Sequence, residues 1–147
     1  MKKIILTPFL IYLIAFNAGA QDGAAEKLVS SMKKADMSYR QLMEVMVKSS
    51  TMMHEGILRE NKQMVEVGAN FIFTHPAPNH KPWSIMQVED QAGFKQSLVA
   101  FDKILDIHTE NIVEAAKKEE WVEASKASHD LMNACISCHA MWRQKVK

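Results

Sequence analysis

Residues 119–143 read EEWVEASKASHDLMNACISCHAMWR, and this stretch decides the fold. It carries Trp121, Ala124, Leu131 and Met132, and no proline interrupts it. We therefore expect a helix that starts near residue 119 or 120 and runs close to the end of the chain.

Cys135-Ile136-Ser137-Cys138-His139, inside this helix, forms a Cys-x-x-Cys-His motif that contains the only two cysteines of the chain. On a helix Cys135, Cys138 and His139 share one face, because residues three and four apart are neighbours. A Cys-x-x-Cys-His run is the attachment signature of a c-type haem. The motif predicts one covalently attached haem c, with His139 as the proximal ligand of the iron.

Two other chemistries use paired cysteines, and both fit this motif poorly. A redox dithiol of the thioredoxin type follows a strand and lies at a helix N-terminus, whereas this pair lies deep in a C-terminal helix. A structural zinc site needs a fourth ligand and usually a second paired cluster, and neither is evident in the sequence.

The first 20 residues have the layout of a secretory signal peptide. Residues 1–3 (MKK) are basic, residues 4–16 are almost entirely apolar, and residues 18–20 (AGA) supply a cleavage signal. The apolar stretch is shorter than the roughly 20 residues that span a bilayer. We expect cleavage after Ala20, a periplasmic location and no membrane span in the mature chain, in agreement with the bacterial attachment of haem after export.

Residues 21–147, the predicted mature chain, are enough for one domain with one core. Losing Lys2 and Lys3 leaves 16 basic against 17 acidic residues, a formal charge of −1. Nothing in this balance indicates binding to nucleic acid or to an anionic membrane. The sequence also shows no paired carboxylates, nucleophile–base arrangement or phosphate loop, so we do not expect an enzyme.

Upstream of the motif, apolar residues recur at helical intervals in three further segments. We expect one long helix, or two collinear ones, from about 24 to 60, a second helix from about 61 to 73, and a third from about 90 to 118. A proline-rich segment at 74–82 is the clear break between them. No stretch alternates with a period of two. The sequence thus predicts an all-α antiparallel four-helix bundle with a C-terminal haem motif, a fold that places cofactors between its helices.

Over essentially the whole mature chain, the sequence resembles the class II c-type cytochromes, which comprise cytochrome c-prime and its six-coordinate, low-spin relatives. The resemblance rests on the motif near the end of the last helix and on the run CISCHAMWR, which places Arg143 four residues after His139. The segment Tyr39-Arg40-Gln41-Leu42-Met43 is similar to the Tyr-Arg…Met pattern of that family.

The resemblance implies a role for the iron position opposite His139. Electron carriers of the family place a methionine there from the first helix, whereas cytochrome c-prime leaves the position open to small gases. Met43 is the first candidate and Met46 the alternative, although such methionines are also typical core filler. By the same comparison, Arg40 and Arg143 would pair with the haem propionates, or they face solvent as most arginines do.

Two functions therefore stay open. One is a periplasmic electron carrier, which cycles between Fe(II) and Fe(III) and meets redox partner proteins in small, short-lived encounters. The other is a five-coordinate protein that binds nitric oxide or carbon monoxide. The resemblance also implies a homodimer through the first two helices, which the methionine-rich first helix would suit but does not require. Bis-histidine ligation or a second metal site is a further alternative for the remaining histidines, which are His54, His75, His80, His108 and His129.

Overall fold

The computed structural model describes the chain from residue 18 to residue 147, with side chains from residue 23 onward. The predicted signal peptide and its cleavage point thus lie outside the residues whose side chains are described. None of the described helices is long and apolar enough to cross a membrane.

Helices make up most of the described chain, which confirms the all-α prediction. The α-helices are α1 (Ala18–Ser31), α2 (Tyr39–Leu58), α3 (Lys62–Thr74), α4 (Gln91–Lys117) and α5 (Trp121–Trp142). Short 3₁₀ helices cover Pro82–Ile85, Val88–Asp90 and Arg143–Lys145. The last three predicted helices match α3, α4 and α5 to within about two residues at each end, the usual uncertainty of helix boundaries.

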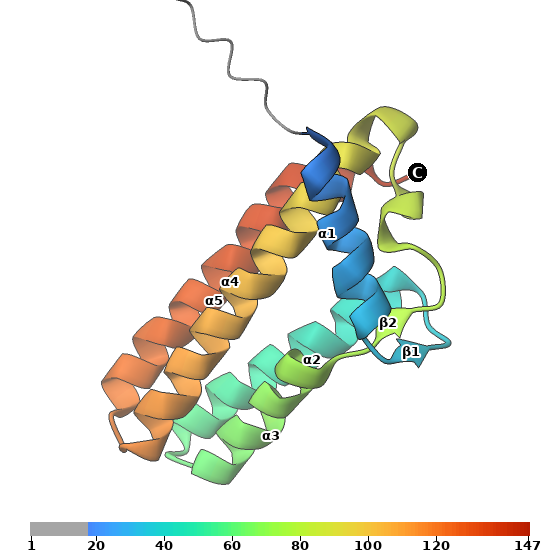
Figure 1. Ribbon diagram of the computed structural model, residues 1–147. Coiled ribbons are helices and arrows are strands. Elements are labelled where there is room, and N and C mark those ends of the chain that lie inside the picture. Colours follow the sequence, from blue (N-terminus) through green and yellow to red (C-terminus); the bar gives the residue numbers. More distant parts are fainter. Residues whose placement is uncertain (1–17) are drawn as a thin grey trace, which may run out of the picture.

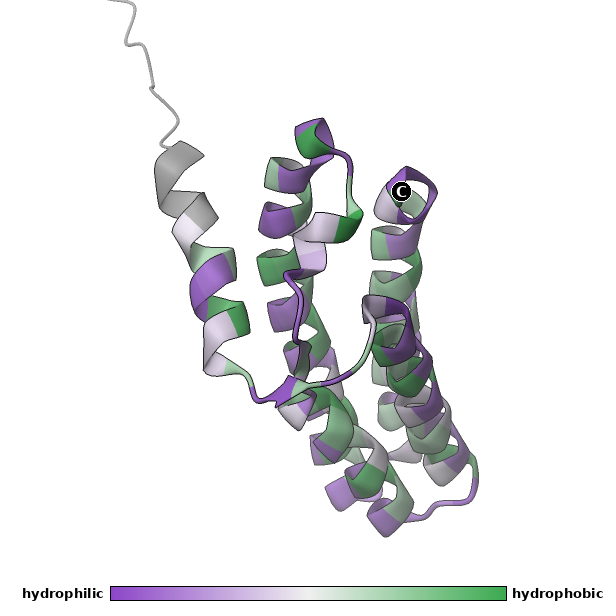
Figure 2. Ribbon diagram, turned by 90° about the vertical axis from the view of Figure 1, so that its right-hand side faces the viewer, coloured by the Kyte–Doolittle hydropathy of each residue, from purple (hydrophilic) through white to green (hydrophobic). Residues whose placement is uncertain are grey.

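Four of the helices pack side by side. α2 lies against α3, α3 against α4, α4 against α5, and α5 against α2. Consecutive helices run in opposite directions, as the colours in Figure 1 show. Each of them carries hydrophilic and hydrophobic residues on different sides (Figure 2), as expected for helices with one buried face. α1 packs against α4 near the end where the chain terminates.

The expectation of one long or two collinear helices from 24 to 60 is wrong. α1 ends at Ser31, and α2 starts at Tyr39 in a different direction (Figure 1). Ser38 caps α2: its hydroxyl accepts a hydrogen bond from the backbone N–H of Gln41 at 3.1 Å, and the Gln41 side chain accepts one from the Ser38 N–H at 2.7 Å. This capping box satisfies backbone donors at a helix start and fixes a new helix beginning at this point.

The sequence also gave no sign of strands, yet one short strand pair is present. β1 (Lys34–Ala35) pairs in parallel with β2 (Ala77–Pro78), and the Ala77 N–H donates to the carbonyl of Lys33 at 2.8 Å. Two residues are too few to show a period of two. The pair ties the connection between α1 and α2 to the proline-rich segment after α3.

Two tight helix-to-helix turns lie at the end of the packed helices that is far from α1 and the strand pair (Figure 1). Glu60 and Glu119 have positive φ angles of 53° and 62°, and they reverse the chain between α2 and α3 and between α4 and α5. Lys62 Nζ lies 2.8 Å from Glu119 Oε1, so an ion pair joins the two turns. We call this end of the molecule the closed end.

The buried apolar residues form two clusters. The first fills the closed end and consists of Met53, Ile57, Val65, Ala69, Ile72, Ile112, Ala115, Ala116, Ala124, Ala127 and Leu131. The second lies under α1 and the loop 75–90 and consists of Ala25, Val29, Ala77, Trp83, Met86, Phe94 and Trp142. Cys138 packs against the second cluster, so the predicted motif lies at this end of the molecule, which we call the open end.

Candidate functional site

A cavity lies in the open end, between α1, α2, α4, α5 and the start of the loop 75–90. It contains about 870 Å³ of space not filled by atoms, counting the part that is open to solvent. The part of it that a water-sized group can reach is about 110 Å³, smaller than the roughly 300–1,000 Å³ of small-molecule and cofactor sites. Its lining is mostly apolar, with Leu28, Val29, Leu42, Phe94, Leu98, Phe101 and Leu105 among the residues that contribute.

The motif residues Cys135, Cys138 and His139 all line this cavity. They lie in the last two turns of α5, so the prediction that the motif is helical is confirmed. Because they are three and four residues apart, α5 presents both sulfur atoms and the imidazole on one side. The three side chains can therefore bond to a single planar group held in the cavity.

The electrostatic surroundings of the two cysteines do not activate them as redox thiols. Burial raises the pKa of Cys135, and burial together with the nearby Cys135 raises the pKa of Cys138. Reactive cysteine pairs have lowered pKa values, commonly from a helix N-terminus or a nearby cation. These thiols lie instead near a helix C-terminus, where the helix dipole disfavours negative charge. The structure thus supports the argument against a redox dithiol.

Two methionines line the cavity together with the motif residues. Met43 of α2 lines the cavity, as does Met32 just after α1. Met46 is absent from the lining and packs against the first apolar cluster. Of the two predicted iron ligands, only Met43 therefore shares the cavity with His139.

The two arginines that would pair with propionates lie outside the cavity lining. The Arg40 side chain is 89% exposed, and its Nε lies 3.3 Å from Glu44 Oε1 on the same helix. Arg143 follows α5 directly and is exposed at the surface. The structure does not bring either guanidinium group together with the motif residues, so their pairing with a cofactor stays a prediction.

A contact between an imidazole and a carboxylate, which the sequence did not reveal, lies in the cavity wall. His75, just after α3, places its Nε2 3.5 Å from Oδ1 of Asp102 on α4, and both residues line the cavity. The contribution of α1 to the wall was also missed. His75 is visible in the sequence as a histidine of the proline-rich segment. Its contact with Asp102 is visible only in the tertiary structure.

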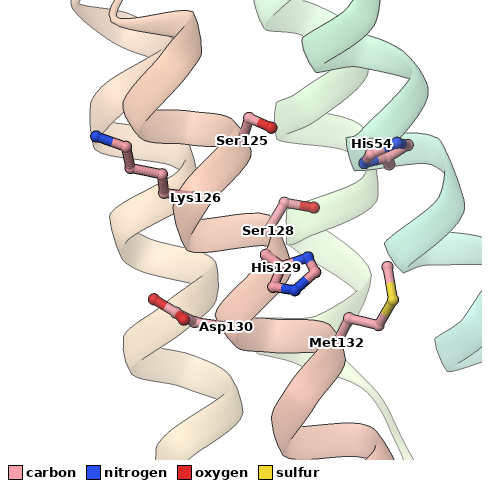
Figure 3. Close-up of a pocket in the computed structure, with 7 residues that line it drawn as sticks. All are labelled: His54, Ser125, Lys126, Ser128, His129, Asp130 and Met132. Atoms are coloured by element: carbon pink, nitrogen blue, oxygen red, sulfur yellow. The ribbon is translucent and has the colours of Figure 1, made fainter.

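A second hollow lies on the surface between α2 and α5 (Figure 3), and it is lined by two of the histidines named as alternative ligands, His54 and His129. His54 of α2 faces His129 and Met132 of α5, whereas Lys126 and Asp130 point to the other side of α5. Within the described part of the chain, no three His, Cys, Asp or Glu side chains gather as they would around a metal ion held by protein alone.

The chain matches no family model, no curated protein and no solved structure.

Proposed function

We propose that this chain is a c-type cytochrome of the class II kind, which holds one haem c in the open-end cavity and carries electrons in the periplasm. The observation that carries the proposal is the coincidence of two independent features. The sequence places a Cys-x-x-Cys-His motif on one helix, and the structure places a largely apolar cavity directly beside it.

The donor set fits a haem better than a bare metal ion. Cys135 and Cys138 would form thioether bonds to the ring, and His139 would bind the iron. A porphyrin supplies four nitrogen ligands of its own, so a cluster of three protein ligands is not needed. When bound, haem supplies a one-electron Fe(II)/Fe(III) couple whose potential depends on the axial ligands and on burial.

The arrangement of α2 to α5 supports the four-helix-bundle part of the proposal. In such bundles, cofactor sites are built from side chains on facing helices. Here α2 supplies Met43 and α5 supplies the motif, and these helices contact each other. Met43 would be the second protein ligand of the iron, and a thioether ligand would raise the reduction potential. The apolar wall would exclude water from the ring.

The experiment is export of the full chain in a bacterial host with a cytochrome c maturation system. We expect an intact mass equal to the chain without residues 1–20 plus one haem, and a c-type pyridine haemochrome spectrum. The double variant Cys135→Ala/Cys138→Ala should carry no covalent haem. A wild-type protein without covalent haem after export would overturn the proposal.

Optical spectra then separate the electron carrier from the gas binder. For the carrier we expect low-spin spectra in both oxidation states, the weak red absorption band of ferric methionine ligation, and no change when carbon monoxide is added to the ferrous protein. Met43→Ala should become high-spin and bind carbon monoxide, whereas Met46→Ala should keep the wild-type spectrum. Rapid binding of carbon monoxide by the wild type would instead favour the five-coordinate, gas-binding function.

A further inference from the structure

The pair His75–Asp102 has a geometry that suits a charged imidazole. Nε2 of His75 lies 3.5 Å from Oδ1 of Asp102, and Nδ1 lies 3.3 Å from the carbonyl oxygen of Pro76. Each ring nitrogen therefore faces an oxygen acceptor. Only the protonated ring donates from both nitrogens, so these surroundings favour the cation.

Both partners are largely removed from solvent. The side chains are 14% exposed for His75 and 23% exposed for Asp102, and both line the open-end cavity. A change of charge elsewhere in the same cavity is therefore screened less than it would be at the surface. The pair can respond electrostatically to a group bound beside it.

The charged and titratable groups around His75 act in opposite directions. Burial disfavours its cation, but the hydrogen bonds to Asp102 and Pro76, and the charges of Asp102 and Asp106 on α4, outweigh burial and raise its pKa. Asp106 itself has a raised pKa, from burial and from the neighbouring Asp102. From α2, Tyr39 remains protonated, because burial and the nearby Cys138 and Asp102 raise its pKa.

From α5, the groups that face the cavity are Cys135, Cys138 and His139. All three are bonded to the cofactor in the proposed function. Among the described protein groups that line the cavity, His75 is then the one whose charge changes in this pH range.

We propose that His75, held by Asp102, is a proton-uptake site coupled to the oxidation state of the iron. This inference rests on the proposed function. When a one-electron donor protein reduces the iron, the site gains one electron and His75 gains one proton from water. On oxidation, the electron leaves to an acceptor protein and His75 returns the proton to water.

Coulomb interaction is the physical reason for this coupling. The iron centre carries one more positive charge when it is oxidised, and that charge disfavours a second cation in the same cavity. We expect the proton affinity of His75 to be roughly tenfold higher in the reduced protein, as for two charges that interact across a partly buried site. In this proposal His75 does not bind the iron. It influences the reduction potential only through the electrostatic interaction between its charge and that of the iron.

The test is the midpoint potential of the haem-loaded full chain, measured between about pH 5 and pH 9, the range in which histidines titrate. In the wild type, the potential should be higher at low pH and fall as pH rises between the two pKa values of His75. A fully coupled proton gives a slope of about 59 mV per pH unit, and a tenfold coupling gives a shallower slope. His75→Gln should abolish this dependence.

Two further variants test whether His75 is the titrating group. Asp102→Asn removes the charge that stabilises the imidazolium, so the pH-dependent window should move to lower pH while the slope persists. His80→Gln is the matched control, because His80 lies in the same loop but does not line the cavity, and it should behave as wild type. NMR titration of the His75 ring should show a higher pKa in the ferrous than in the ferric protein.

Each contrary result has a distinct meaning. If haem is attached but the slope is unchanged in His75→Gln, the titrating group lies elsewhere, for example on the porphyrin carboxylates, and the inference is overturned. If His75→Gln changes the ligation spectrum of the wild type, His75 is an iron ligand, and the inference is overturned as well. If no haem is attached to the wild type, the proposed function fails and the inference fails with it.

Discussion

The closed end and the open end of this molecule are built from the same helices but filled differently. At the closed end, side chains such as Met53, Val65 and Ile112, none of them exposed to solvent, fill the space between α2, α3, α4 and α5. At the open end α1 and the loop 75–90 are added as walls, and a cavity remains. The comparison shows that buried side chains fill one end of the molecule, whereas the other end encloses a cavity.

Two methionines on α2 test most directly whether the closed end is packed more densely than the open end. Met53 is 0% exposed in the closed-end cluster, whereas Met43 lines the cavity and is half-buried. We expect Met53→Ala to lower the free energy of unfolding by about 2–5 kcal/mol, because it removes buried apolar atoms and leaves a void. Met43→Ala should cost less than about half as much, because its surroundings are already partly empty.

Both variants should be made in the background Cys135→Ala/Cys138→Ala, so that unfolding reports packing without a covalent cofactor. Urea unfolding followed by circular dichroism gives the free energies. Equal losses for the two methionines would show that the open end is packed as densely as the closed end, and the contrast between the ends would then be false.

The next largest effect concerns the close approach of α2 and α3. A Cβ atom added at Gly68 would lie 2.7 Å from the carbonyl oxygen of Ser49 and 2.7 Å from Cγ of Met53. Backbone cannot yield as a flexible side chain does, so we expect Gly68→Ala to destabilise the protein by about 1–3 kcal/mol.

Gly23 of α1 is the matched control for that prediction. A Cβ at Gly23 would meet nothing within 4 Å. Alanine is the better helix former, so Gly23→Ala should leave the stability unchanged or raise it by up to about 1 kcal/mol. Urea unfolding followed by circular dichroism measures both variants. A Gly68→Ala protein as stable as wild type would mean that α2 and α3 can separate at no cost, and that the closed end is less rigid than its packing implies.

Much of the helical structure could be predicted from the sequence, because helical periodicity is a local property. The break between α1 and α2 was missed, although Ser38 and Gln41 carry the spacing of a capping box. Apolar residues continue at helical intervals on both sides of Ser38, and this periodicity masked the cap. The pairing of Ala35 with Pro78 had no local signal, since strand pairs of two residues depend on tertiary contact.

The site was predictable to the extent that it lies on one helix. Cys135, Cys138 and His139 share a face of α5 by spacing alone. Met43 and Met46 are only three residues apart, yet one lines the cavity and the other packs on the closed-end cluster. Residues three apart lie only about 60° from each other around the helix axis, so the limit of the cavity falls between two neighbouring positions of α2. The sequence could not show where that boundary falls.

The smallest expected effect tests how α1 is held at the open end. Lys95 Nζ on α4 lies 2.8 Å from Glu26 Oε1 on α1. The hydrogen bond from Lys95 lowers the pKa of Glu26 below its usual value of 4.5, against a smaller opposing contribution from burial. A carboxylate with a lowered pKa stabilises the folded state fully above its unfolded pKa, and this stabilisation is lost as pH falls through the folded value.

We therefore expect Glu26→Gln to be less stable than wild type at pH 7 and equal to it once the carboxylate of the wild type is protonated in acid. The Glu26 side chain is 42% exposed, so the difference at pH 7 should not exceed about 1 kcal/mol. Thermal unfolding of both proteins across the acid range measures it. Glu44→Gln, which removes the more exposed pair with Arg40, should show a smaller difference. If instead Glu26→Gln matches wild type at every pH, apolar contacts through Ala25 and Val29 hold α1, and this wall of the cavity depends on apolar packing.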